Sequence, residues 1–194
     1  MERRIERLEK QVPEFIRDLE EMFGPRDPKF EFGRIAPECP PTTFFRKKGI
    51  TCVKRMGSCR FTGGVVDIHL TREALEHPCK TLSRWQLAHE CLHLIDPYGG
   101  CNSSGEPLRT NVLEEGLATW YQNNRVVCRD CVVSRSYSDA ENLVTPFMET
   151  LPGAIRRIRR DRRLAIGDIP EDVLIQYCPK VKGVAQKLTA RFSS

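Results

Sequence analysis

His89 and His93 are four residues apart, and Glu90 directly follows the first histidine. Residues at this spacing lie one above the other on a helix, so both imidazoles can bind the same metal ion. Glu90 then lies beside that face, where its carboxylate can take a proton from a water molecule that the metal activates but is poorly placed to bind the metal itself. The three residues therefore predict a metal site with its own general base.

The helix that must carry these residues is marked by the residues around it. Ser83 is a favourable N-cap and Gln86, three residues later, completes a capping box, which predicts that the helix begins near Arg84. The run 96–100, Asp-Pro-Tyr-Gly-Gly, predicts its end, because proline cannot continue a helix and two glycines favour a turn. An apolar stripe for the core is formed by Leu87, Cys91, Leu94 and Ile95.

Two histidines leave such a site incomplete, since a catalytic zinc ion normally has three protein ligands and a water molecule. A metzincin would have glycine three residues after the second histidine and a ligand six residues after it, where this chain has Asp96 and Gly99. A histidine four residues after His93 is also excluded, because that residue is Pro97. A glutamate on a second helix remains, and the stretch 111–121 contains two adjacent glutamates.

Helix capping assigns different roles to these two glutamates. If Asn111 is the N-cap, Glu114 completes a capping box at the third helical position, and Glu115, one residue further round, faces the metal. Gly116 lowers helix propensity by roughly 1 kcal/mol relative to alanine. A close approach between the two helices would explain why this cost is tolerated. The apolar stripe of the second helix is formed by Leu113, Leu117, Trp120 and Tyr121.

The motif His-Glu-Cys-Leu-His at 89–93, followed 22 positions after its second histidine by Glu-Gly-Leu-Ala at 115–118, resembles the gluzincin class of zinc metallopeptidases. The resemblance covers about residues 64–122, and it is closest to the small single-domain gluzincins. It implies that the zinc ligands are His89, His93 and Glu115, and that Glu90 is the general base. It also implies a zincin-like fold in which the strand 65–69 lies at the edge of the cleft and pairs with substrate backbone.

Length and composition are those of a globular chain with one domain or a domain and a small appendage. The 194 residues are 40% hydrophobic and 29% charged, with a formal net charge of +5. We divide the chain into an N-terminal helix (1–28), a catalytic core (29–125) and a helical C-terminal subdomain (126–194). No apolar run approaches the roughly 20 residues of a membrane span, and the N-terminus lacks a signal-peptide core. We therefore expect a cytoplasmic protein without a membrane partner.

The remaining elements predict an α+β fold with a small, mainly antiparallel sheet packed on the two site helices. Residues 3–23 have apolar residues at helical spacing, and Gly24-Pro25 ends this helix. It is either a cover packed on the catalytic core or a removable inhibitory segment. Strands are predicted at 29–35, 43–46, 50–54 and 65–70, and further helices at 138–148, 152–163, 170–177 and 181–192.

Nine cysteines are many for a chain in a reducing compartment, where most should be free thiols. Cys128 and Cys131 have the spacing of half a structural zinc site, and Cys52 with Cys59 could supply the other half. The favoured interpretation is that these residues are small, partly buried side chains and that the catalytic zinc is the only metal.

The function that these residues predict is zinc-dependent hydrolysis of peptide bonds in a protein or peptide substrate. The oxyanion is expected to be stabilised by one of four residues, Tyr137, Tyr98, Arg125 or His69, with Tyr137 slightly favoured. Asp96 or a backbone carbonyl could orient a ligand histidine. An alternative is a non-catalytic interaction or regulatory module with a structural zinc, associated with nucleic acid through the arginine-rich stretch 156–163, although we do not expect a nucleic-acid partner. A deformylase-like activity is a third, less favoured hypothesis.

Overall fold

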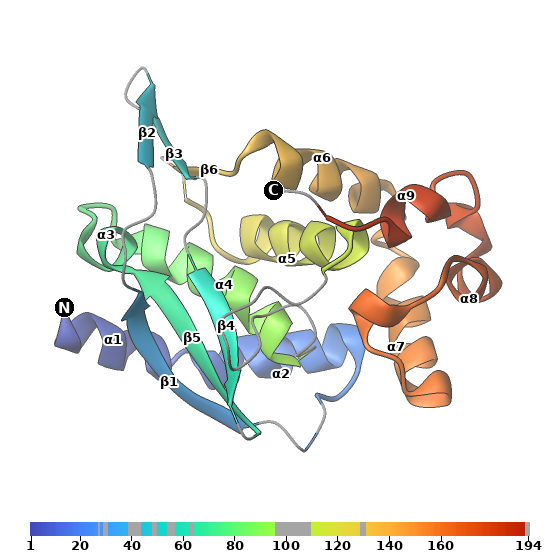
Figure 1. Ribbon diagram of the computed structural model, residues 1–194, viewed down its shortest axis with the longest axis horizontal. Coiled ribbons are helices and arrows are strands. Elements are labelled where there is room, and N and C mark those ends of the chain that lie inside the picture. Colours follow the sequence, from blue (N-terminus) through green and yellow to red (C-terminus); the bar gives the residue numbers. More distant parts are fainter. Residues whose placement is uncertain are drawn as a thin grey trace.

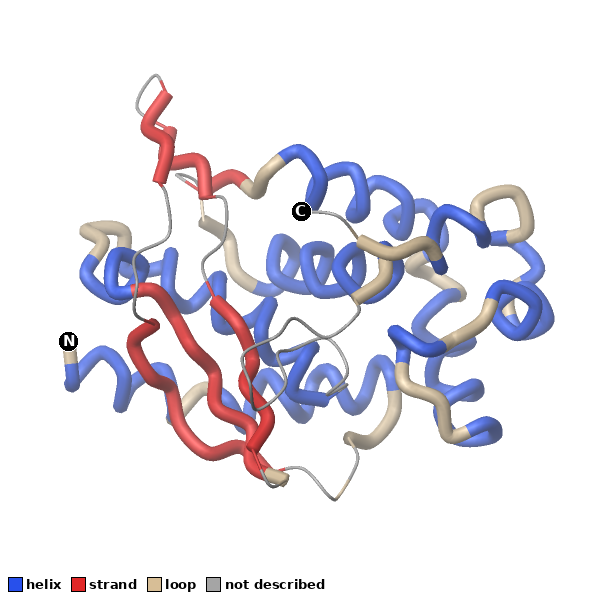
Figure 2. The backbone as a smooth tube through the Cα atoms, viewed as in Figure 1, coloured by secondary structure: helices blue, strands red, loops and turns tan. Residues whose placement is uncertain are grey.

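The computed structural model describes residues 1–26, 28, 31–38, 44–47, 50–53, 57–62, 64–95, 110–128 and 131–192. These residues have an α+β fold in which helices predominate (Figure 1; Figure 2). None of the helices in this described part combines the length and apolar character needed to span a bilayer. The α-helices are α1 (Glu2–Glu9), α2 (Val12–Phe23), α3 (Arg72–Glu76), α4 (Lys80–Ile95), α5 (Val112–Arg125), α6 (Arg135–Val144), α7 (Leu151–Arg162), α8 (Glu171–Tyr177) and α9 (Ala185–Thr189).

The strands form two small mixed sheets rather than the mainly antiparallel sheet that we predicted. One has the order β1-β5-β4, with β5 (Val65–Thr71) parallel to β1 (Glu31–Glu38) and antiparallel to β4 (Gly57–Thr62). The other has the order β2-β3-β6, with β3 (Ile50–Val53) antiparallel to β2 (Phe44–Lys47) and parallel to β6 (Cys131–Val132).

The parallel pairing of β1 with β5 follows from the length of chain between them. A short turn at Gly64 joins β4 to β5, and strands joined in this way must be antiparallel. The chain from β1 to β5 passes through three other strands, which is enough for it to return in the same direction. On β5, Val66, Ile68 and Leu70 are all 0% exposed, which confirms the alternation predicted for this strand. Its backbone pairs on both sides, so the predicted substrate strand 65–69 has no open edge.

Helix α4 lies at the centre of the fold, in contact with α2, α5, β4 and β5 (Figure 1). It begins at Lys80, four residues before the start we predicted, and Ser83 is buried inside it instead of capping it. Leu82 and Trp85 are 0% and 2% exposed, so burial of an additional apolar turn against the core overrides the local capping signal. The predicted end at 96–100 lies outside the described residues.

The N-terminal segment consists of two helices, not the single helix predicted for residues 3–23. The helix is interrupted at Lys10 and Gln11. Pro13 lies in the first turn of α2, where its missing N–H group is tolerated. Gly24 has a positive φ of 94° and ends α2 as predicted. Phe15, Leu19 and Phe23 of α2 are 0% exposed and belong to the same hydrophobic core as α4 and α7. Helix α2 is therefore an integral part of the core.

Arg159 of α7 connects the ends of two core helices. Its guanidinium donates hydrogen bonds to the carbonyl oxygens of Phe23 (3.3 Å) and Gly24 (3.1 Å) at the end of α2. It also donates to the carbonyl oxygen of Ile95, the last residue of α4, at 2.8 Å. Carbonyl groups in the last turn of a helix have no partner within the helix and carry partial negative charge, so the arginine stabilises the end of the helix that holds His89 and His93.

Gly116 allows close packing of α5, but its neighbour is α6 and not α4 as we predicted. A Cβ atom at this position would lie 2.6 Å from the carbonyl oxygen of Ala140 and 3.0 Å from Cγ1 of Val144. The first of these atoms belongs to the backbone and cannot move independently of α6. The glycine therefore sets the distance between α5 and α6.

We expect Gly116→Ala to lower the free energy of unfolding by about 1–3 kcal/mol, because overpacking outweighs the roughly 1 kcal/mol gained in helix propensity. Gly153 of α7 provides the matched control, since a Cβ atom there would meet nothing within 4 Å. Gly153→Ala should leave stability unchanged or raise it by up to about 1 kcal/mol. Urea denaturation followed by circular dichroism measures both effects, and equal stability of the two variants would contradict the proposed packing constraint.

Candidate metal centre

The side chains of His89, His93 and Glu115 converge between α4 and α5. Their ligand atoms all lie within 4.8 Å of one another. The Nε2 atom of His89 is 3.4 Å from Nε2 of His93 and 3.2 Å from Oε2 of Glu115, and Nε2 of His93 is 3.7 Å from Oε1 of Glu115. All three residues are buried. Two imidazole nitrogens and one carboxylate are the donor set of a three-ligand catalytic zinc site, so the residues that are present fit this metal.

The two helices hold these residues together because they run in opposite directions. Trp85, near the start of α4, donates a hydrogen bond from its indole N–H to Oδ1 of Asn123, near the end of α5, at 2.9 Å. His89 and His93 follow along α4 and meet residues near the start of α5. The pairing of Trp85 with Asn123 at one end and of the histidines with glutamates at the other fixes the register between the helices.

Local capping orients the start of α5 as the sequence predicts. The side-chain oxygen of Asn111 accepts a hydrogen bond from the backbone N–H of Glu114 at 2.9 Å, which confirms Asn111 as the N-cap. The hydroxyl of Thr110, the preceding residue, donates a hydrogen bond to the carboxylate of Glu115. Thr110 was missed at the sequence level, because no short motif indicates a hydrogen bond of this kind. Together these contacts direct Glu115 toward the histidines.

The carboxylate of Glu114 contacts His93, a partner that the predicted capping box did not include. Its Oε1 atom lies 2.8 Å from Nδ1 of His93, and the residue is 0% exposed. A carboxylate bonded to Nδ1 fixes the histidine tautomer in which Nε2 is free to bind a metal, and it raises the basicity of the ring. The adjacent glutamates thus have complementary positions, with Glu115 beside the Nε2 atoms and Glu114 behind one imidazole.

The substitution Glu114→Gln should reduce zinc affinity by roughly 10- to 100-fold without abolishing binding, as is usual for a group that orients a ligand histidine. Glutamine keeps an acceptor for His93 but removes the negative charge. Competition with a chromophoric chelator measures the affinity. Glu21→Gln, at an exposed position of α2, is the control and should bind zinc as the unmodified chain does. An unchanged affinity in Glu114→Gln would show that the His93 contact does not support the metal.

The electrostatics of the cluster favour a charged pair. Burial alone would lower the pKa of His93, but the carboxylates of Glu115 and Glu114 outweigh it and raise the pKa to about 10. Burial also opposes ionisation of Glu115, yet the charges of His93 and His89 hold the pKa of Glu115 below its ordinary value. At neutral pH the imidazolium of His93 therefore faces a carboxylate, and a metal ion that binds here takes the place of that proton.

Glu90 lies at the edge of the same cluster and is 6% exposed. Its charge contributes to the raised pKa of His93. The thiol of Cys59, on β4, donates a hydrogen bond to the backbone carbonyl of Glu90 at 3.3 Å and lies 3.8 Å from its Oε2 atom. Burial and the nearby charge of Glu90 raise the pKa of Cys59 well above its ordinary value, so the thiol stays protonated. The strand β4 is thereby placed directly beside Glu90.

Known proteins do not identify this centre. The chain matches no model of a known protein family, no curated protein and no solved structure. Its assignment therefore rests on its donor atoms, on their burial and on the groups around them.

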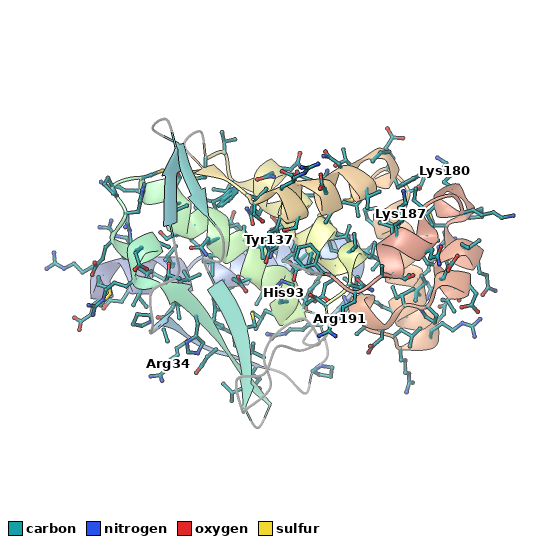
Figure 3. The ribbon with its side chains drawn as sticks, turned by 45° about the horizontal axis from the view of Figure 1, so that its top comes forward. Arg34, His93, Tyr137, Lys180, Lys187 and Arg191 are labelled. Carbon is teal, nitrogen blue, oxygen red and sulfur yellow. A yellow bond between two sulfur atoms is a disulfide. The ribbon has the colours of Figure 1, made fainter. Side chains whose placement is uncertain are left out.

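Tyr137 of α6 lies next to the cluster, and Figure 3 shows it with His93 in the central region of the molecule. Its ring centroid is 5.6 Å from that of His89, in an edge-to-face arrangement. Phe192 also packs against Tyr137, with ring centroids 4.9 Å apart. Phe192 reaches this position because its backbone N–H donates to the carbonyl of Thr110 at 3.0 Å. The C-terminal segment therefore holds Tyr137 against the site.

Two other residues predicted to take part in the site, Arg125 and His69, lie outside the ligand cluster. Arg125 forms ion pairs of 2.7 Å with Glu14 and with Asp18 of α2. It is ten residues from Glu115 on the same helix, which corresponds to about 15 Å, so it is excluded as an oxyanion-stabilising group. His69 lies on β5 in register with Ala36 and Ser58, and the structure does not bring it into the ligand cluster. Tyr98 and Asp96 lie outside the described residues.

The cysteines are also arranged differently from the half-sites that we considered. Cys59 lies beside Glu90 and is not part of the cysteine cluster. Cys128 and Cys131 meet Cys79 instead. The backbone of Cys52 pairs with that of Val132 on β6, and its side chain lies outside the described residues. Cys79 was missed at the sequence level because it is separated from Cys128 by 49 positions.

Proposed function

We propose that the chain is a zinc-dependent hydrolase of peptide bonds with a gluzincin-type site on a zincin-like core. His89, His93 and Glu115 would hold the metal, and Glu90 would act as the general base. The observation that carries this proposal is the convergence of two Nε2 atoms and one carboxylate within 4.8 Å, with Glu90 adjacent to the first histidine. A purely structural zinc site would not need an acid at that position.

The chemistry divides between the metal and the side chains around it. A bound zinc ion supplies Lewis acidity, which lowers the pKa of water and polarises a carbonyl group. Glu90 accepts the proton of the attacking water and later delivers it to the leaving amine. Glu114 keeps His93 in the required tautomer through its contact with Nδ1. Burial of Glu90 strengthens these interactions, because the local dielectric is low.

Tyr137 is the best supported of the four candidates for stabilising the oxyanion. Its ring contacts that of His89, and Phe192 also packs against it. A phenol hydroxyl can donate a hydrogen bond to the charge that develops on the carbonyl oxygen of the substrate. Arg125 is removed from consideration by its ion pairs with α2. His69 lies on β5 in register with Ala36 and Ser58, and Tyr98 lies outside the described residues.

The geometry of β4 supports a protein or peptide as the substrate. Among the described strands, β4 pairs with β5 alone, so it is an edge strand of its sheet. Cys59 of β4 touches Glu90, and a substrate strand added to β4 would therefore run past the general base. This assigns to β4 the role that we predicted for the strand 65–69.

The nucleic-acid alternative receives less support from the arginine-rich helix. Arg159 binds carbonyl oxygens at the ends of α2 and α4, and Arg157 donates to the carbonyl of Tyr177 at 3.4 Å. Arg160 pairs with Asp161 at 2.7 Å. These guanidinium groups are engaged by the protein itself, which is the usual state of an arginine-rich helix face in a folded domain. We therefore retain the non-catalytic module only as the outcome of a failed activity test.

Activity should depend strictly on the metal. Purified protein loaded with zinc is expected to cleave members of a peptide library, to lose this activity after treatment with a chelator, and to regain it when zinc is restored. Cleavage sites are identified by mass spectrometry, and bound zinc is measured in the same samples. A protein that holds zinc through His89, His93 and Glu115 but cleaves no peptide would contradict the hydrolase and favour the non-catalytic module.

A further inference from the structure

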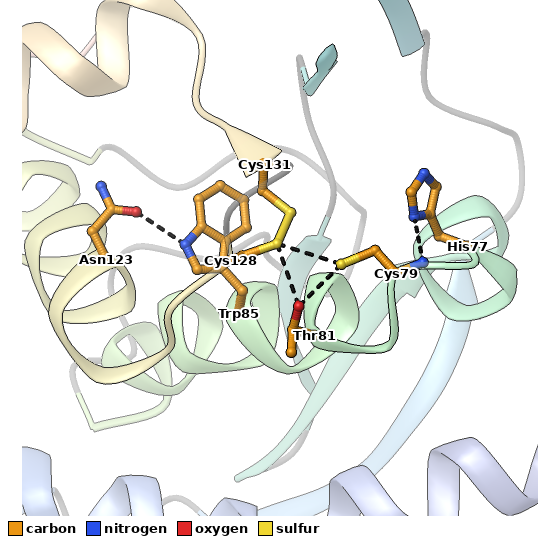
Figure 4. Close-up of a disulfide and its surroundings, with 7 residues drawn as sticks. All are labelled: His77, Cys79, Thr81, Trp85, Asn123, Cys128 and Cys131. Carbon is orange, nitrogen blue, oxygen red and sulfur yellow. Dashed lines mark hydrogen bonds between the residues drawn. A yellow bond between two sulfur atoms is a disulfide. The ribbon is translucent and has the colours of Figure 1, made fainter. Parts of the chain in front are cut away.

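Three cysteine sulfur atoms meet at the ends of α4 and α5 that are remote from the His–Glu cluster. Cys79 directly precedes α4, Cys128 follows the end of α5, and Cys131 begins β6. Their sulfur atoms lie within 4.8 Å of one another (Figure 4). The structure joins Cys128 and Cys131 by a disulfide, and Cys79 is a free thiol. We infer that in the reduced protein these three cysteines bind a second zinc ion with a structural role.

Three thiolates would supply three of the four positions of a tetrahedral zinc site, and the distance between the sulfurs of Cys79 and Cys128 fits this geometry. A Zn–S distance of about 2.3 Å at the tetrahedral angle places two sulfurs roughly 3.8 Å apart. The Sγ atoms of Cys79 and Cys128 are 3.7 Å apart. Cys128 and Cys131 have the Cys-x-x-Cys spacing typical of structural zinc sites. The hydroxyl of Thr81 lies 3.0 Å from Sγ of Cys79 and 3.5 Å from Sγ of Cys128, so a hydrogen-bonding group already lies beside these sulfurs.

Metal binding at this position requires the two bonded sulfurs to be reduced. A thiol reductant breaks the Cys128–Cys131 bond by exchange, which yields two protein thiols and converts the reductant to its own disulfide. Zinc then displaces the thiol protons, because only thiolates bind the metal. All three cysteines are half-buried, and a pocket of about 330 Å³ lined by Cys128, Cys131 and Ser138 opens beside them. The sulfurs are therefore accessible to both the reductant and the ion.

This second site would fix the orientation of the catalytic helices. It joins the start of α4 to the segment after α5, across 49 positions of sequence. The hydrogen bond from Trp85 to Asn123 lies between the cysteines and the His–Glu cluster along the same pair of helices. A metal ion that binds only the folded chain stabilises it by mass action. The cysteine site thus supports the register that brings His89 and Glu115 together.

Metal stoichiometry of the full-length reduced protein tests this inference. After loading with zinc and removal of the excess, the unmodified chain should retain two equivalents. Cys79→Ser should retain one, and the double variant His89→Ala/His93→Ala should also retain one. Cys178→Ser is the matched control, because Cys178 lies outside the cluster with its Sγ 3.8 Å from the hydroxyl of Thr150, and it should retain two equivalents.

Cobalt gives a second measurement, and its deciding sample is the unmodified chain, so the outcome does not depend on the folding of a variant. Thiolate ligands produce an intense charge-transfer absorption with bound Co²⁺, whereas histidine and glutamate ligands do not. The unmodified chain and the double histidine variant should both show this band, and Cys79→Ser should lose it. Absence of the band from the unmodified reduced chain would overturn the inference. So would a zinc content that is the same in Cys79→Ser as in the unmodified chain. Because the double histidine variant isolates the cysteine site, failure of the proposed hydrolase would be seen separately.

Discussion

Glu90→Gln is expected to lower kcat/KM for peptide cleavage by roughly a hundred- to ten-thousand-fold while zinc remains bound. Glutamine has nearly the same shape as glutamate but cannot accept a proton from water. The proposed metal ligands are other side chains, and the contact between Cys59 and the backbone carbonyl of Glu90 does not depend on the carboxylate. Binding and folding should therefore survive, and the proton transfer alone should be lost.

Zinc content and activity must be measured on the same preparation for this result to be interpretable. Glu21→Gln is the control, because it makes the same chemical change at an exposed position of α2 and should retain full activity. Full activity in Glu90→Gln would refute the assignment of Glu90 as general base. Loss of both zinc and activity would instead assign Glu90 to the metal coordination.

Local signals in the sequence were sufficient for much of the site. The spacing of His89 and His93 requires only one turn of helix to bring both rings to the same face, and the N-cap Asn111 sets the start of α5 through one short hydrogen bond. These features depend on residues within a few positions of one another. They were therefore accessible without any knowledge of the fold, as was the alternation of Val66, Ile68 and Leu70.

The features that could not be predicted depend on contacts between distant parts of the chain. Glu114 could bond either to the backbone at the start of its own helix or to His93, and only the packing of α5 on α4 decides between them. Gly116 correctly indicates a close approach, but a glycine does not specify which helix approaches. The strand β4 begins with glycine, serine and cysteine, which give little local indication of a strand. Its position is instead decided by the burial of Cys59 beside Glu90, a contact between distant parts of the chain.

The division of roles between Glu114 and Glu115 leads to the second large effect. Glu115→Gln should weaken zinc binding by more than the roughly 10- to 100-fold expected for Glu114→Gln, because it replaces a proposed charged ligand rather than a group that orients one. The carboxylate of Glu115 lies 3.2 Å from Nε2 of His89 and 3.7 Å from Nε2 of His93, whereas Oε1 of Glu114 lies 2.8 Å from Nδ1 of His93. Peptide cleavage should fall with the metal content.

The comparison of the two variants distinguishes a metal ligand from a group that orients a ligand histidine, since both variants change the same chemical group at adjacent positions. Zinc affinity is measured by chelator competition, and thermal unfolding followed by circular dichroism establishes that each variant is folded. Addition of excess zinc should restore activity to Glu114→Gln, whose ligands are intact, but not to Glu115→Gln, whose ligand set is incomplete. A larger loss of affinity in Glu114→Gln than in Glu115→Gln would reverse the two roles and would require α5 to be rotated relative to α4.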